Sequence, residues 1–309
     1  MLYAFQPRTG TLEPVTAPPR SGWVHAVRPT EGELSLLRDA VGVPAEFLTH
    51  AVDLDEVARV DRVEGGASLI MLREPCRTRA NQAAHFRSAP VGVVLLDGVL
   101  VTIAPMETEI IQDLLALPAL APEQPHTFLL QLVLCTAERF LAHLRTIDRE
   151  VDALEDRLQV SLDNEQVLEL LAYQKSLVHF TSALTSNRHM LERLQKDPRF
   201  EISKTDHDLI EDALVEIHQA IEVATVSQNV LGQMMNAFAS VISNNVNMVM
   251  KILTAFTIVL MIPTLVTSFY GMNVPLPGQG HPFAAAFVFA GSVVAGGIVV
   301  AVFARKRWL

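Results

Sequence analysis

Hydrophobic and polar residues alternate in short runs through the first 125 residues. Apolar runs typical of strands cover residues 23–27, 67–72, 91–96 and 99–103. Asp97 and Gly98 separate the last two runs and favour a tight hairpin turn. Helices are predicted over 30–41, where Thr30 and Glu33 make a capping box, and over 44–50. Residues 1–125 are therefore predicted to form an α/β domain.

From residue 126 onward, apolar residues recur every three or four positions, as they do in amphipathic helices. The stretches 128–159 and 166–194 follow this pattern and are separated by a break near 161–164. Residues 126–202 are therefore predicted to form an antiparallel helical hairpin.

A longer helix is predicted to follow, with residues 203–250 forming a stalk. Mostly apolar residues keep spacings of four and three along it: Ile210, Leu214, Ile217, Ile221, Ala224, Gln228, Leu231, Met235, Phe238 and Ile242. This spacing indicates a coiled-coil seam between parallel copies rather than a helix lying on a globular core. No helix breaker precedes the next apolar segment, so one helix of about 65 residues, roughly 100 Å long, is expected.

Two C-terminal segments have the composition of membrane spans. Residues 252–269 are uncharged and mostly apolar, and at 1.5 Å per residue they cover roughly 27 Å, about one bilayer core. The spans are predicted at 251–271 and 283–304, joined by a loop at 272–282. The second span contains small residues suited to close helix packing: Gly291, Ser292, Ala295, Gly296 and Gly297.

The first span carries a mildly polar line on one face. Thr254, Thr257, Met261, Thr264 and Ser268 are spaced three, four, three and four residues apart, so a helix places them in one row. The positions between them are apolar. After residue 270, Pro275 and Pro277 prevent the helix from continuing. Such a helix is predicted to line a pore.

The distribution of charged residues, like that of apolar residues, distinguishes the N-terminal part of the chain from the two predicted spans. All 34 acidic residues lie at or before Glu222. Because four of the 24 basic residues lie beyond it, residues 1–222 carry 20 basic and 34 acidic side chains, a formal charge of −14. An acidic domain disfavours nucleic acid as a partner and is compatible with cations. We find no phosphate-binding loop and no nucleophile elbow, so the chain is not expected to be an enzyme.

Flanking charges predict the membrane orientation. Lys251 and the basic tail 305–309 border the two spans, whereas 271–281 has no charge, so both termini are expected in the cytoplasm. The first residues lack the pattern of a signal peptide. Cys76 and Cys135 lie 59 positions apart and are interpreted as small apolar residues in a reducing compartment.

The triplet Gly271-Met272-Asn273, placed after Tyr270 between two spans, resembles the signature of the CorA superfamily of two-helix divalent-cation channels. The resemblance extends to residues 23–34, 147–158, 249–254 and 305–309, and to Pro263. It implies an α+β cytoplasmic domain, a long-helix stalk and two transmembrane helices per subunit. The implied assembly is a homopentameric, funnel-like channel in the inner membrane, with itself and membrane lipid as partners.

The resemblance also implies roles for individual residues. A ring of Asn273 amides would bind the waters of a hydrated ion at a mouth formed with Gly271 and Met272. Residues matching pore-lining positions of the family are Asn247, Met250, Leu253, Met261 and Thr264. Apolar rings at Met250, Leu253 and Met261 would form the constriction. The ion, expected to be Mg²⁺, would be the substrate and a regulator, with no permanently bound cofactor.

Four carboxylates near the start of the stalk are candidate regulatory metal ligands: Asp206, Asp208, Glu211 and Asp212. The resemblance implies that such residues bind divalent ions between subunits and hold the channel closed. The alternative is that they are only acidic residues favoured by a helix N-terminus. His207 and His218 add a weak indication of a transition-metal sensor.

The identity of the ion stays open. The loop after Asn273 lacks the acidic residue common in the family, and His281 leaves room for Zn²⁺, Co²⁺ or Ni²⁺. A zinc transporter of the same superfamily, including a proton-linked one, is therefore an alternative. A non-conducting, membrane-anchored scaffold is the alternative from another functional class.

Overall fold

The structure, a computed structural model, describes residues 1–8, 11–15, 22–63, 66–78, 84–117, 120, 124–160, 164–198, 200, 203–274, 278 and 280–306. These residues form two compact units, Met1–Gln233 and Met234–Leu309. Helix α6 contributes residues to both units, and each unit is described by itself.

Among the residues described, seven strands form one sheet, which is the framework of the first unit. Its order is β2-β1-β3-β7-β6-β5-β4, with β3 and β7 parallel and the other pairs antiparallel. The strands are β1 (Leu2–Arg8), β2 (Thr11–Val15), β3 (Gly22–Val27), β4 (Arg59–Arg62), β5 (Ser68–Arg77), β6 (Phe86–Leu96) and β7 (Val99–Ala104).

The predicted hairpin about Asp97 and Gly98 is present as β6 and β7, and Gly98 has the positive φ of 79° that the turn requires. The other two predicted runs correspond to β3 and β5. Strands β1, β2 and β4 were not predicted. They contain proline or several charged residues and lack an apolar alternation, so only pairing with neighbouring strands reveals them.

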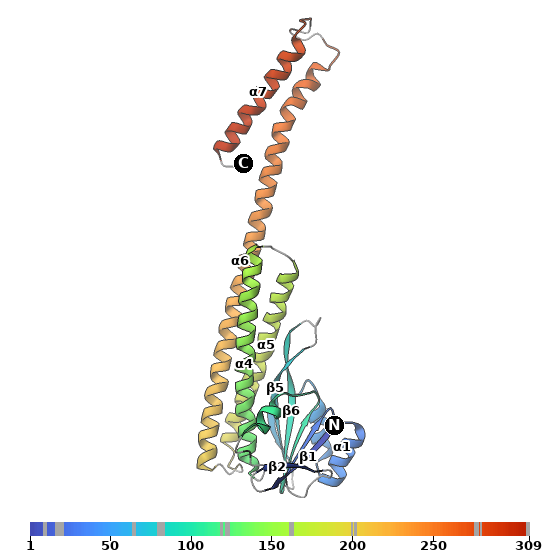
Figure 1. The fold of residues 1–309 in the computed structure, drawn as a ribbon, viewed down its shortest axis with the longest axis vertical. Coiled ribbons are helices and arrows are strands. Elements are labelled where there is room, and N and C mark those ends of the chain that lie inside the picture. Colours follow the sequence, from blue (N-terminus) through green and yellow to red (C-terminus); the bar gives the residue numbers. More distant parts are fainter. Residues whose placement is uncertain are drawn as a thin grey trace. The chain divides into compact units, whose positions relative to one another are not determined.

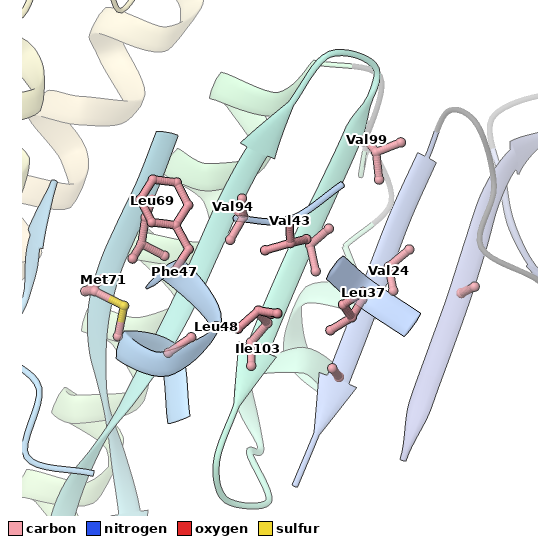
Figure 2. Packing of buried hydrophobic residues seen from close by; sticks show 14 residues of the cluster. Val24, Leu37, Val43, Phe47, Leu48, Leu69, Met71, Val94, Val99 and Ile103 are labelled. Carbon is pink, nitrogen blue, oxygen red and sulfur yellow. The ribbon is translucent and has the colours of Figure 1, made fainter. Parts of the chain in front are cut away.

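One face of the sheet is covered by α1 (Glu31–Leu36), the π-helical turn η1 (Leu37–Val41) and α2 (Ala45–Val52). Figure 2 shows Leu37 and Phe47 packed over apolar side chains of the sheet such as Val94. The predicted capping box is present, because the Thr30 N–H donates to Glu33 Oε2 at 2.8 Å and Glu33 N–H donates to Thr30 Oγ1. A Cβ at Gly92 would lie 2.7 Å from that of Ala51, so only glycine allows α2 to approach β6 this closely.

The other face of the sheet packs against the predicted helical hairpin, α4 (Pro125–Val160) and α5 (Asn164–Gln195) (Figure 1). Phe128 of α4 lies 5.0 Å from Trp23 of β3, and Phe180 of α5 lies 5.8 Å from Phe86 of β6, both between ring centroids. A short helix that was not predicted, α3 (Ile110–Leu115), packs against α4.

Helix α6 (Lys204–Tyr270) is continuous, as the absence of helix breakers predicted. The prediction that its whole seam serves association between copies is wrong for residues 210–231. In this part Ile210, Ile217, Ala224 and Leu231 are buried within the single chain. Polar contacts join α6 to both helices of the hairpin: Ser227 Oγ donates to Asp148 of α4 at 2.7 Å, and Gln228 Nε2 to Thr181 of α5 at 2.9 Å.

The prediction fails for residues 210–231 because a helical bundle within one chain uses the same alternation of four and three residues as a coiled coil between chains. Spacing identifies the packed face but not the partner. Beyond the first unit, Met235 and Phe238 are only partly buried and Ile242 is exposed, so this later part of the seam is available to other chains.

The second unit pairs the C-terminal part of α6 with α7 (Ala284–Arg305), and the two helices run side by side (Figure 1). Ser292 and Gly296 of α7 and Ala255 of α6 are buried. A Cβ at Gly296 would lie 4.0 Å from the Val259 carbonyl oxygen, whereas Gly291 and Gly297 face open space. Close packing through small residues therefore uses Ser292 and Gly296, one turn apart.

Among the residues described, three helices are long and apolar enough to cross a membrane: Pro125–Arg157, Asp206–Tyr270 and Ala284–Arg305. The most apolar window of the first is 61% buried inside the protein, against 6% and 11% for the other two. The apolar residues of α4 therefore form part of the core of the first unit. The C-terminal part of α6 and α7 remain as the candidate spans, and the proposed limits of the membrane and loop regions stay predictions.

Candidate functional site

The polar line of the first span lies on the face of α6 that is turned away from α7. Ala255, Val259, Ile262 and Val266 are buried or partly buried, and their spacing marks the face covered by α7. At about 100° per residue, the predicted pore-lining positions fall roughly on the opposite side of the helix. All of them are exposed in the single chain: Asn247, Met250, Leu253, Thr254, Thr257, Met261, Thr264 and Ser268.

Threonine hydroxyls on this line are oriented by the helix backbone. The Oγ1 atoms of Thr254, Thr257 and Thr264 donate hydrogen bonds of 2.7–2.8 Å to the carbonyl oxygens four residues earlier. Because the hydroxyl hydrogen is used in the backbone contact, the oxygen lone pairs are left as acceptors. The line therefore offers water-binding oxygens without adding charge.

Pro263 interrupts the hydrogen bonding of α6 beside α7. Proline has no N–H, so the carbonyl oxygen of Val259 lacks its usual helical donor. That carbonyl faces Gly296 of α7, where an added Cβ would make an ordinary contact of 4.0 Å with it. One turn later, Thr267 Oγ1 donates to the Pro263 carbonyl at 2.9 Å.

The Gly271-Met272-Asn273 triplet directly follows the end of α6 at Tyr270. The Gly271 N–H donates to the Thr267 carbonyl at 3.0 Å, and the Met272 N–H to Phe269 at 3.3 Å. A Cβ at Gly271 would lie 3.3 Å and 3.4 Å from the carbonyl oxygens of Thr267 and Ser268, which is tight for any other residue. Asn273 follows in an exposed bend. Pro275 and Pro277 lie outside the described residues.

The four candidate regulatory carboxylates have two different environments. Asp206 is buried, whereas Asp208, Glu211 and Asp212 are exposed. Asp206 accepts hydrogen bonds from Thr127 Oγ1 at 2.6 Å and from Ser203 N–H at 3.1 Å, and its own N–H donates to Ser203 Oγ at 3.1 Å. This is a capping box at the start of α6 joined to α4, a structural role for Asp206.

These contacts also set the charge of Asp206. Burial alone would raise the pKa of this carboxyl, but the hydrogen bonds from Thr127 and Ser203 outweigh burial and hold the pKa below its ordinary value. The Ser203-x-x-Asp206 spacing can be recognised in the sequence as a helix-capping signal, whereas the contact between Asp206 and Thr127 cannot be predicted from it.

No group of three or more His, Cys, Asp or Glu side chains within the described part of the chain could hold a metal ion. His218 Nε2 lies 3.3 Å from Glu222 on the same helix, and His207 is exposed. His281 Nδ1 accepts the Phe283 N–H at 3.3 Å just before α7.

Glu74 and the two cysteines of the first unit carry no negative charge near neutral pH. Burial raises the pKa of Glu74 to about 8, so this carboxyl is neutral near pH 7. Burial likewise raises the pKa of both Cys76 and Cys135 to about 11, so neither is a thiolate. Cys135 is buried and Cys76 partly buried, in keeping with their interpretation as small apolar residues.

Comparisons with known proteins cover nearly the whole chain. The family model of the CorA-like Mg²⁺ transporter protein matches residues 20–306. A protein of Methanocaldococcus jannaschii described as cobalt/magnesium transport protein CorA is 28% identical over 294 residues, 93% of this chain and 91% of that one.

Solved structures show the same fold. The complete structure of the CorA magnesium transporter from Methanocaldococcus jannaschii superposes with a TM-score of 0.85 at 25% identity, over 100% of this chain and 99% of that one. The ZntB cytoplasmic domain from Vibrio parahaemolyticus has a TM-score of 0.60 at 15% identity, covering 80% and 97% of the two chains, and shares the fold.

Proposed function

This chain belongs to the family of CorA-like Mg²⁺ transporter proteins, and on that basis we propose that it forms a homopentameric channel for divalent cations, principally Mg²⁺, in a cell's inner membrane. The observation that carries the proposal is the exposed line of threonine, serine and methionine on α6. It lies opposite the face covered by α7 and leads to Asn273. A membrane helix that met only lipid would gain nothing from such a line.

The exposure of this line in one subunit supports assembly around an axis. Five copies would turn their lines inward, while α7 forms an outer ring towards lipid. Both termini then lie in the cytoplasm, because Lys251, Arg305 and Lys306 border the spans on one side. The 272–282 loop faces the outside.

Selection of the ion is assigned to the mouth formed by Gly271, Met272 and Asn273. Mg²⁺ loses its water reluctantly, and a carboxylate ring would hold it too tightly for release. A ring of Asn273 amides can instead bind the waters of the hydrated ion. Entry of two charges through 100 mV releases roughly 4.6 kcal/mol, so inward flux needs no other energy source.

The gate is assigned to apolar rings farther along the pore. Met250, Leu253 and Met261 are bulky, apolar and 54–60% exposed in the single chain, on the same line as the threonines. A narrow ring of such side chains excludes water. A divalent ion cannot cross it because methionine and leucine do not replace its hydration.

Regulation is assigned to the exposed carboxylates at the start of α6. Asp208, Glu211 and Asp212 are available to a neighbouring subunit, whereas Asp206 is already engaged by Thr127 and Ser203. Internal Mg²⁺ bound between subunits would hold the channel closed. When internal Mg²⁺ falls, repulsion between the carboxylates would loosen the assembly and open the pore.

Zinc, cobalt or nickel transport is the second candidate within the family. The Methanocaldococcus jannaschii relative is described as transporting cobalt and magnesium, and the described residues of the outer loop contain no acid. His281 provides only weak support, because its Nδ1 atom already accepts the Phe283 N–H. A non-conducting scaffold is disfavoured because it needs neither the polar line nor Asn273.

Replacement of Asn273 by alanine tests the proposal. Purified wild-type protein in liposomes should take up Mg²⁺, with Co²⁺, Ni²⁺ and Zn²⁺ compared in parallel. Asn273→Ala should abolish uptake while the oligomer, followed by size-exclusion chromatography with light scattering, stays intact. Asn245→Ala is the matched control, because it removes an exposed amide from α6 outside the polar line. Wild-type uptake by Asn273→Ala contradicts the pore assignment.

A further inference from the structure

The end of α5 and the turn that follows it enclose a hollow on the surface of the first unit. Its volume is about 490 Å³, which lies within the usual range for sites that bind small molecules. A smaller hollow of about 140 Å³ shares Arg193 and Asp197 with it and is also lined by Val60 and Arg62 of β4. We call the residues that line the larger hollow the wall: His189, Glu192, Arg193, Lys196, Asp197 and Pro198.

Both acidic residues of the wall are engaged by arginines. Asp197 Oδ2 lies 3.1 Å from Arg62 Nη1 of β4, and Glu192 Oε1 lies 3.7 Å from Arg188 Nε, one turn earlier on α5. The negative charge of the wall is therefore balanced by side chains beside it.

Two basic residues of the wall have no acidic partner. Arg193 and Lys196 are exposed, and neither forms an ion pair within the part of the chain that the structure describes. They lie three positions apart, so their side chains leave the same face of the helix end. Together with Arg62 and Arg188 they give four bases against two acids, a net charge of +2, in a domain whose formal charge is −14. Unpaired cations at one hollow of an acidic domain favour an anionic ligand.

Basic residues near a helix C-terminus can also serve the helix itself, by complementing its last carbonyl groups. Here the turn after α5 already contributes to this, because the Asp197 N–H donates to the Leu194 carbonyl at 3.2 Å. In addition, the buried Nε atoms of Arg62 and Arg188 have no hydrogen-bond partner among the residues described. The surroundings of the hollow are therefore short of acceptors, and an anion supplies acceptors.

We propose that this hollow binds a soluble organic phosphate of about nucleotide size, with Arg193 and Lys196 as the ligands of its phosphoryl groups. A guanidinium fork and an ammonium group are the side chains typical of phosphate sites. His189 and Pro198 are exposed in the same wall and offer ring faces to the organic part. The wall contains no large apolar side chain that could hold a lipid tail, which favours a soluble ligand. This anion site is separate from the proposed cation pathway.

Titration calorimetry of the detergent-solubilised full chain with ATP, in a buffer free of divalent cations, tests the site. The double variant Arg193→Gln, Lys196→Gln should weaken ATP binding by at least about tenfold, because it removes two charge-assisted contacts. The double variant Arg145→Gln, Lys175→Gln is the matched control. It removes the same charge from two exposed positions outside the hollow and should leave the affinity for ATP unchanged.

A second measurement guards against a folding defect in the variants. ATP should raise the unfolding temperature of the wild type and of the control, and should not raise that of the variant at Arg193 and Lys196. Pyrophosphate, the probe for the phosphate part alone, should bind less tightly than ATP because it does not reach the rings of His189 and Pro198. Equal affinity for the two probes would overturn the organic part of the proposal.

Two results would overturn the site as a whole. The first is a wild-type protein that does not bind ATP. The second is an equal loss of ATP affinity in both double variants, which would indicate a diffuse effect of charge. Uptake of Mg²⁺ is measured separately in liposomes, so the anion site and the channel assignment fail independently.

Discussion

At the scale of single residues, neighbouring carboxylates of the same type have different environments. Asp206 and Asp208 are two positions apart, yet one is buried in hydrogen bonds to Ser203 and Thr127 and the other is exposed. The two residues flank His207 in the sequence. Position on the helix separates them, because the face that bears Asp206 packs against α4.

This difference predicts that structure and regulation can be separated by mutation. Asp206→Ala should lower stability by about 1 kcal/mol, the usual effect of losing a helix cap. The triple variant Asp208→Asn, Glu211→Gln and Asp212→Asn should leave stability nearly unchanged and raise conductance at millimolar internal Mg²⁺. Urea unfolding followed by the fluorescence of Trp23, in a Trp308→Phe background, measures the first effect, and patch recordings measure the second.

The pH dependence of unfolding gives a further check on Asp206. Because its pKa is lower in the folded state, its contribution to stability is present above the ordinary value of 3.8 and is lost as the pH falls through the lowered value. Asp206→Ala should therefore flatten the acid limb of the stability curve. Normal stability combined with lost Mg²⁺ inhibition in Asp206→Ala would assign this residue to the regulatory site instead.

At the scale of elements, the contact between α6 and α7 depends on small residues. Without a hydrophobic driving force between helices in lipid, close approach of backbones supplies the packing energy. Ser292 and Gly296 provide that approach beside Ala255 and the Val259 carbonyl. The adjacent Gly297 is equally small but faces open space in the chain.

Two leucine substitutions distinguish these neighbouring glycines. Gly296→Leu should force α7 away from Val259, with a loss of about 1–3 kcal/mol from overpacking. Gly297→Leu adds the same side chain and should be nearly neutral. Thermal unfolding of the detergent-solubilised protein checks both variants. Equal destabilisation by the two would mean that α7 packs on α6 through a different face.

At the scale of the whole molecule, the proposed channel separates selection from gating. Asn273 follows the end of α6, and Leu253 lies in α6 about five turns before that end, so selection and gating are assigned to different rings. A polar ring recognises a hydrated ion, whereas an apolar ring blocks water. A substitution in the Asn273 ring should therefore leave gating unaffected, and a substitution in the Leu253 ring should leave ion selection unaffected.

Leu253→Asn tests this separation. A polar ring in place of the apolar one should admit water and produce leak at high internal Mg²⁺, while competition between ions at the outer mouth is preserved. Flux assays with internal Mg²⁺ varied, and with competing Co²⁺ outside, measure both properties. If the variant closes normally, or loses ion competition, the gate lies elsewhere.

The sequence alone determined those features that depend on local order. Composition and length marked both candidate membrane helices, the uninterrupted pattern predicted continuous α6, and Asp97 with Gly98 specified the β6–β7 hairpin. The Gly271-Met272-Asn273 triplet indicated the family that the comparisons establish. Each of these signals lies in a few neighbouring residues or in a repeating spacing, so no long-range contact is needed to read it.

Only the tertiary structure decided which partners those elements meet. The seam of α6 predicted a packed face, but the burial of Ile217 and Ala224 against α4 and α5 showed that residues 210–231 pack within the chain. Strands β1, β2 and β4 and the contact of Asp206 with Thr127 were likewise invisible in the sequence. The spacing of apolar residues predicts that one face of a helix is packed against another element. The identity of the covering residues is a property of chain segments that lie far apart in sequence, and only folding brings those segments together.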